Sequence, residues 1–124
     1  MNTSTERKGP LSRFTILDAT RVRAGPTAIR TFADLGHRQP DGICADAEGA
    51  IWTGCFNTGE FLRVLDGGEI TDRITFDGCG VACTLGGPDN HTLFCTVYCG
   101  PVDDLIAGKR KAAVFTLTVS VGAP

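Results

Sequence analysis

Asp41 is the residue of this chain whose surroundings best suit metal chemistry. It stands between Pro40, whose ring restricts one backbone angle, and Gly42, which lets the backbone approach a ligand closely. A carboxylate held in this way can bind a hard cation such as Ca²⁺, which prefers oxygen ligands. The alternative is a turn aspartate that caps backbone amides after the proline. Residue type alone leaves both interpretations open.

Two further acids, Asp46 and Glu48, follow closely and could form a general acid and base pair. They flank Gly49 between two runs of β-forming residues, 43–45 and 50–53, which is typical of a tight hairpin turn. We therefore expect both side chains to be solvated at the outer end of the strands, with no catalytic role.

Six cysteines are many for a chain of 124 residues. The spacings Cys79-x3-Cys83 and Cys95-x3-Cys99 raise the alternative of a zinc site. On a strand, however, residues four apart merely share one face. Cys83 and Cys95 fall in strand-like runs, as does Cys44, where a free thiol behaves as a small buried hydrophobe. Because no export signal is visible, we expect reduced thiols.

The remaining polar candidates stand in loops. His37 and His91 have no nucleophile-elbow sequence beside them, so surface positions are expected. Asn57 and Asn90 occupy turns, where we expect a left-handed backbone conformation in place of metal binding.

Short strands separated by turns must position these residues. The first expected unit has strands at 42–46, 50–55, 60–65 and 69–76, and Asp66-Gly67-Gly68 forms a tight turn between the last two. The second unit has strands at 81–85, 92–97 and 113–119, with a short helical turn at 102–107. Upstream, 13–18 and 28–34 are expected to be the outer strands of a preceding unit. Since no long helical period occurs, the sequence predicts an all-β fold.

The two units repeat one another. Ile43-Cys44 recurs as Ala82-Cys83, and Ile51-Trp52 recurs as Leu93-Phe94, at an offset of about 40 residues that is typical of β-propeller blades.

The stretch PDGICADAEGAIW at 40–52 closely resembles the SMP-30/gluconolactonase family, as do FADL at 32–35, ACTLGGPD at 82–89 and TLF at 92–94. The resemblance extends over about residues 14–119 and places these motifs in the family's order. It implies a six-bladed β-propeller of which this chain supplies a C-terminal part. The expected fold is a partial β-propeller of two to three four-stranded antiparallel blades.

The same resemblance implies an activity and a site. The family hydrolyses lactones with a divalent metal at the central channel, and Asp41 matches its metal-binding aspartate, which is also its candidate for activating the attacking water. We expect Ca²⁺, with Zn²⁺, Mg²⁺ or Mn²⁺ as alternatives, polarising the carbonyl of a sugar lactone or related cyclic ester. The other ligands should lie upstream of Phe14, where Glu6 is a poor match, so only Asp41 is assigned to the metal and to catalysis.

Two secondary expectations follow from the blade arrangement. Cys79, between Gly78 and Gly80, would lie at the same end of its blade as Asp41 and could line the channel. Four aromatic residues at alternating strand positions are expected to pack between blades, namely Trp52, Phe61, Phe94 and Phe115.

Length limits how much of a propeller the chain can form. A closed propeller needs at least four blades of about 40–50 residues, so 124 residues accommodate two or three. We expect residues 1–12 to be a polar lead and 13–124 to be the partial propeller, within a C-terminal fragment of a longer protein. The alternatives to a hydrolase are a non-catalytic module that binds or self-assembles through exposed strand edges, or an inactive truncated product.

Charge argues against two classes of partner. The net charge is −2, with both signs scattered along the chain, which suits neither nucleic acid nor an anionic membrane surface. No apolar run has the length of a membrane span. We expect a cytoplasmic protein whose ligand is a small lactone.

Overall fold

The structure is a computed structural model that describes residues 33–124. The expectations for the polar lead at 1–12 and for a strand at 13–18 lie outside the described residues, as does most of the strand expected at 28–34. Ala33 and Asp34, the last two residues of that segment, are described and lie outside any strand.

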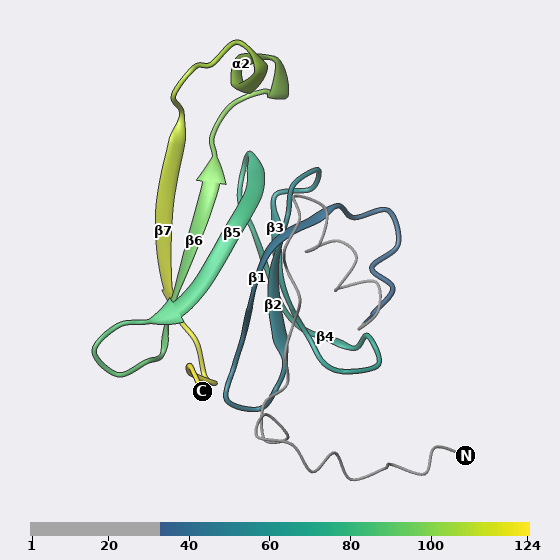
Figure 1. The fold of residues 1–124 in the computed structure, drawn as a ribbon, viewed down its shortest axis with the longest axis vertical. Coiled ribbons are helices and arrows are strands. Elements are labelled where there is room, and N and C mark those ends of the chain that lie inside the picture. Colours follow the sequence, from purple (N-terminus) through teal and green to yellow (C-terminus); the bar gives the residue numbers. More distant parts are fainter. Residues whose placement is uncertain (1–32) are drawn as a thin grey trace, which may run out of the picture.

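The first sheet has four antiparallel strands in the order β1-β2-β3-β4 (Figure 1). Each strand pairs with its neighbour in the chain, so the sheet is a meander, as predicted. The strands are β1 (Pro40–Ala45), β2 (Ile51–Cys55), β3 (Glu60–Val64) and β4 (Ile70–Thr75). Their bounds agree with the expected ones to within two residues, because turn-forming residues such as glycine occur at every connection between the strands.

The second sheet has three antiparallel strands in the order β5-β6-β7. They are β5 (Cys79–Gly86), β6 (Thr92–Tyr98) and β7 (Ala112–Thr118), and the short helix α2 (Val102–Ile106) interrupts the connection between the last two. In Figure 1 this sheet stands beside the first, and α2 caps the far end of β6 and β7. No helix among residues 33–124 is long and apolar enough to cross a membrane.

Glycines with positive φ form the tight turns. Gly67 (φ 93°) and Gly68 (φ 99°) turn the chain between β3 and β4, and the amide of Gly68 donates to the carbonyl of Leu65 at 2.9 Å. Gly49 (φ 79°) does the same between β1 and β2. A side chain with a Cβ would be strained at these angles, which explains why the turn signals in the sequence were reliable.

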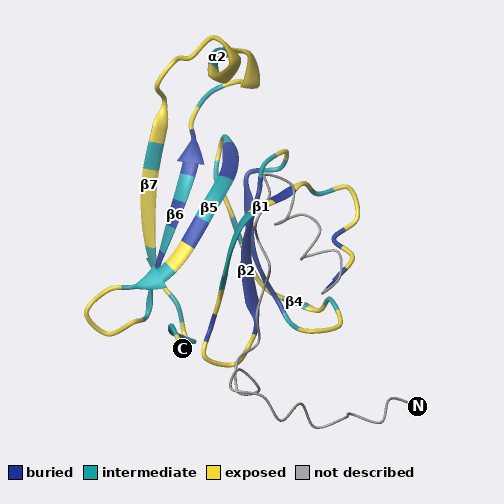
Figure 2. Cartoon of the chain, in the orientation of Figure 1, coloured by how far each residue is buried: buried dark blue, intermediate teal, exposed yellow. Residues whose placement is uncertain are grey.

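Both faces of the first sheet are covered by apolar side chains. Every residue of β2 and β3 is buried, whereas β7 is largely exposed (Figure 2). On the face away from the second sheet, Leu62 and Val64 pack with Ala33 and Leu35. On the other face, Trp52 and Phe61 join a cluster from the second sheet made of Cys83, Leu93, Cys95 and Val97. This second cluster, which we call the inter-sheet core, holds the two sheets together.

The aromatic residues divide between two environments. Trp52 and Phe61 are buried in the inter-sheet core, as predicted. Phe115 is 38% exposed and stacks on Phe76 with ring centroids 4.5 Å apart. Phe94 alternates with Leu93 and Cys95, so it faces away from the inter-sheet core and is only half-buried.

The edge strands β1 and β5 approach each other very closely. A Cβ placed on Gly42 would lie 2.6 Å from the Cβ and 2.7 Å from the Cα of Ala82. We expected Gly42 to let the backbone approach a ligand, but the neighbour it accommodates is the adjacent strand. The two sheets can therefore make this contact only because residue 42 is a glycine and has no side chain.

Replacing Gly42 by alanine should separate these strands and destabilise the protein by about 1–3 kcal/mol, the usual cost of overpacking. Urea denaturation followed by circular dichroism measures the loss. Gly86→Ala is the matched control, because Gly86 also lies in a strand and its added Cβ would meet only Phe94, at 3.7 Å. Equal effects of the two substitutions would contradict the close approach.

Candidate functional site

Asp41 lies in a bulge at the start of β1. Pro40 pairs with Cys55 and Ile43 pairs with Thr53, so Asp41 and Gly42 together stand opposite one residue, Gly54. A bulge of this kind bends the strand and redirects a side chain, and bulges are frequent beside active sites. Asp41 is exposed, as a ligand of an external cation must be.

The environment of Asp41 disfavours its charge. Partial burial raises the pKa of the carboxyl above its ordinary value, because the carboxylate loses part of its hydration. None of the ion pairs found among residues 33–124 involves it. A carboxylate without a cationic partner is stabilised by a bound cation, so Asp41 suits the role of a ligand.

β5 carries a bulge at the corresponding place. Gly80 pairs with Val97 and Ala82 with Thr96, so Val81 is the extra residue. Ile43 and Ala82 are the first paired residues after the two bulges. The residue two positions before Ile43 is Asp41, and the residue two positions before Ala82 is Gly80, so Gly80 is the counterpart of Asp41. The second sheet therefore repeats the backbone of the candidate site without its carboxylate.

The register also corrects one expected equivalence. Trp52 pairs with Cys44, and the residue that pairs with Cys83 is Cys95. The counterpart of Trp52 is thus Cys95 and not Phe94, one residue further along than the sequence repeat indicated. The hairpin between β5 and β6 is longer than the first hairpin, which shifts the sequence offset.

The side chain of Asn57 fixes the segment that leads into Asp41. Its Oδ1 accepts from the amide of Gln39 at 2.8 Å, and its Nδ2 donates to the carbonyl of His37 at 3.0 Å. The expectation of a left-handed backbone at Asn57 is wrong: among non-glycine residues of the described part, only Asn90 has a positive φ, 61°. Asn57 acts through its amide side chain, which clamps two loops together.

Glu60 and Arg38 form a second clamp on the same segment. Arg38 Nε and Nη2 donate to Glu60 Oε2 and Oε1 at 2.6 and 3.1 Å, and the Thr58 hydroxyl donates to Oε2 at 2.6 Å. The hydrogen bonds from the Arg38 guanidinium lower the pKa of Glu60 to about 2. The sequence alone does not reveal this pair, because no local pattern connects residues 22 positions apart.

At the opposite end of the strands, Asp46 is buried in an ion pair. The expectation that it is solvated is wrong, since the residue is 2% exposed. Its Oδ2 accepts from Arg63 Nε at 2.6 Å, and its Oδ1 accepts from the amides of Glu48 and Ala50 at 2.9 and 3.0 Å. Arg63 Nη2 also donates to Glu48 Oε2 at 2.7 Å. Because both oxygens of Asp46 are engaged, this carboxylate has a structural role and no catalytic one.

The described residues do not form a complete metal site. No group of three or more His, Cys, Asp or Glu residues between 33 and 124 is placed to hold a metal ion. The zinc alternative for Cys79, Cys83, Cys95 and Cys99 therefore gains no support. His91 is used structurally, with its Nδ1 2.9 Å from the carbonyl of Val119. The Asp41 carboxylate is of the oxygen-ligand type that a hard cation prefers, and no group of three such residues within 33–124 includes it.

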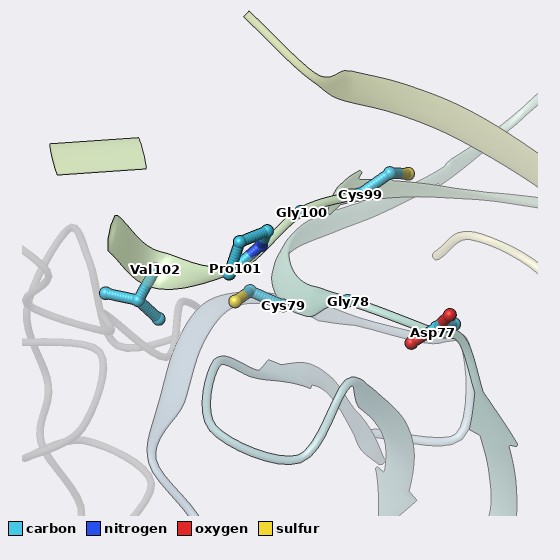
Figure 3. A pocket seen from close by; sticks show the side chains of 7 residues that line it. All are labelled: Asp77, Gly78, Cys79, Cys99, Gly100, Pro101 and Val102. Atoms are coloured by element: carbon cyan, nitrogen blue, oxygen red, sulfur yellow. The ribbon is translucent and has the colours of Figure 1, made fainter. Parts of the chain in front are cut away.

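Cys79 lines a pocket of about 400 Å³ where β5 begins (Figure 3). Asp77 and Gly78 lie beside it, and the opposite wall consists of Cys99, Gly100, Pro101 and Val102. The Cys79 and Cys99 side chains point in different directions in Figure 3. The pocket lies at the end of β5 that corresponds to the Asp41 end of β1, which is where Cys79 was expected to line a channel.

Two antiparallel meanders, packed face to face with β1 and β5 adjacent, define this part of the chain as two neighbouring blades of a β-propeller. Two solved structures share this fold. A calcium-binding protein, regucalcin, from Agrobacterium tumefaciens has a TM-score of 0.57 and 23% identity over 75% of this chain and 33% of that chain. A luciferin-regenerating enzyme has a TM-score of 0.56 and 21% identity over 68% of this chain and 30% of that chain.

The chain belongs to the SMP-30/gluconolactonase/LRE-like family, whose model matches residues 11–98. It is 37% identical to Xenopus laevis regucalcin over 68 residues, which are 52% of this chain and 22% of that protein. It is 34% identical to Danio rerio regucalcin over 82 residues, 59% of this chain and 26% of that protein. The match thus spans about a quarter of the length of these relatives.

Proposed function

We propose that this chain provides part of the active site of a divalent-cation-dependent lactone hydrolase, with Asp41 as a ligand of the cation. The observation that carries the proposal is the environment of Asp41. The residue is exposed and lies in a bulge at the start of β1, and no ion pair among residues 33–124 engages its carboxylate. Family membership and the similarity to a calcium-binding regucalcin support Ca²⁺ as the cation.

The chemistry assigned to the chain rests on one carboxylate. A bound cation would polarise the lactone carbonyl and stabilise the oxyanion that forms there. Asp41 has a raised pKa, which makes its carboxylate a better proton acceptor, so it suits activation of the attacking water as well. Asn57 and the Arg38–Glu60 pair hold the preceding segment and thereby position Asp41. The remaining ligands of the cation must come from outside residues 33–124.

The experiment compares hydrolysis of glucono-δ-lactone by the wild-type chain and by Asp41→Asn, with and without Ca²⁺. We expect a slow Ca²⁺-dependent release of acid from the wild-type chain that falls about 100-fold in the variant, as for loss of a general base. Asp66→Asn is the matched control, because Asp66 is exposed in the turn between β3 and β4. No Ca²⁺-dependent rate in the wild-type chain, or equal rates in both variants, would contradict the proposal.

A second candidate function, self-association, is favoured by the outer edge of β7, which no other strand of residues 33–124 covers. Among residues 33–124, this strand pairs with β6 alone. Its sequence AAVFTLT has no charged residue, and Val114 is 64% exposed. Such an edge can pair with the same edge of a second copy. Light scattering should then show a discrete oligomer that Val114→Lys converts to a monomer, whereas a wild-type monomer would rule this candidate out.

A further inference from the structure

The adjacent strands β1 and β5 carry one cysteine each at equivalent positions. Cys44 follows Ile43 in β1, and Cys83 follows Ala82 in β5, the residue that occupies the place of Ile43 in the second sheet. The two sulfur atoms lie 3.9 Å apart. The contact of Gly42 with Ala82 brings the two backbones together just before this pair.

The two thiols differ in exposure and acidity. Cys83 is buried in the inter-sheet core, whereas Cys44 is half-buried at its border. The hydrogen bond with the Cys83 thiol lowers the pKa of Cys44, an effect that burial opposes, and the same pairing raises the pKa of Cys83. Cys44 is thus the thiol that ionises first and that a small oxidant can reach, and Cys83 stands beside it.

Two other buried cysteines are less acidic than Cys44. Cys95 lies in the same core, and burial raises its pKa to about 12. Burial also raises the pKa of Cys55, to about 11. Since the thiolate is the reacting species, both are expected to stay reduced. Cys99 is exposed and serves as an internal reference for unassisted oxidation.

We propose that Cys44 and Cys83 form a redox-sensitive pair that closes into a disulfide between the two blades on exposure to a hydroperoxide. The Cys44 thiolate attacks the peroxide oxygen, the O–O bond breaks, and Cys44 becomes a sulfenic acid while the second oxygen leaves as water or alcohol. The Cys83 sulfur then attacks the Cys44 sulfur, the S–O bond breaks and a second water leaves. The peroxide takes up the two electrons that the thiols lose.

The cross-link fits the fold because it joins strands that already touch. The sulfur atoms must approach from 3.9 Å to the bond length of about 2.05 Å, a shift that side-chain rotation and small backbone adjustments can provide. It would tie the inner edges of the two blades together across 39 residues of chain. A closed loop of this size restricts the unfolded chain, so the oxidised protein should resist unfolding better than the reduced one.

The test treats the reduced full chain with hydrogen peroxide, blocks free thiols with N-ethylmaleimide and maps the disulfides by mass spectrometry. Cleavage after Arg38 and Glu48 leaves a peptide whose only cysteine is Cys44. The peptide that contains Cys83 also holds Cys79, Cys95 and Cys99, so fragment-ion sequencing must locate the linked sulfur. We expect the link from Cys44 to fall on Cys83, both in wild type and in Cys95→Ala. The link should be lost in Cys44→Ala and Cys83→Ala.

The stability of the oxidised protein is the second readout. Its urea midpoint should shift upward relative to the reduced protein, and Cys44→Ala should show no such shift. A link from Cys44 to any cysteine other than Cys83 would overturn the proposal. The proposal would also fail if maleimide still labels Cys44, which shows that its thiol stayed reduced, under conditions that oxidise Cys99. An oxidised protein whose midpoint is unchanged or lower would overturn it as well.

Discussion

Replacing Arg63 by methionine is expected to lower the free energy of unfolding by about 3–5 kcal/mol, the usual cost of breaking a buried ion pair from one side. The Asp46 side chain is 0% exposed and that of Arg63 is 8% exposed. Methionine fills similar space but leaves the Asp46 carboxylate buried without a cation. Urea denaturation followed by circular dichroism measures the loss.

Two controls separate the buried charge from other effects of the Arg63 substitution. In the double variant Asp46→Asn/Arg63→Met, the neutral amide keeps an acceptor for the turn amides and removes the charge, so most of the stability should return. Lys109→Met removes a cation from an exposed pair with Asp104 and should change stability little. If Arg63→Met is tolerated as well as Lys109→Met, the burial of Asp46 is wrong.

Replacing Trp52 by alanine is expected to cost about 3–5 kcal/mol, because it leaves a large cavity in the inter-sheet core. Trp52 is 1% exposed and packs with Phe61 and with residues of the second sheet. Its Nε1 is buried, and no acceptor for it is found within residues 33–124. An unpaired N–H of this kind offsets part of what the ring contributes.

The matched variant Trp52→Phe keeps most of the apolar ring and removes the unpaired N–H. We expect it to lose much less stability than Trp52→Ala. Both variants lack the only tryptophan of the chain, so tryptophan fluorescence cannot follow their unfolding. Circular dichroism in urea measures it instead. A phenylalanine variant as unstable as the alanine variant would mean that Nε1 has a partner, or that the ring is not packed as described.

Strands and turns were predictable because their signals are local. Gly67 and Gly68 mark a turn by themselves, and a short run of β-forming residues such as 92–97 marks a strand without knowledge of its partner. The two units also repeat, so the second sheet could be inferred from the first. The one-residue error at Trp52 arose because the two hairpins differ in length, which only the pairing register shows.

The candidate site was predictable only in part, because its surroundings are not local in sequence. Asp41 could be singled out from its neighbours Pro40 and Gly42. The burial of Asp46 depends on Arg63 from another strand, and the clamp on the segment before Pro40 depends on Glu60. No spacing rule connects such partners, because the sheet register decides which side chains meet.

Binding of a divalent cation at Asp41 is the central claim, and a titration with Mn²⁺ followed by NMR tests it most directly. Mn²⁺ broadens the signals of nearby nuclei, so even weak binding to an incomplete ligand shell is located. We predict that broadening centres on the amides of Asp41 and Gly42, is reversed by Ca²⁺ and disappears in Asp41→Asn. Broadening centred on Asp103 and Asp104, or unchanged in Asp41→Asn, would contradict it.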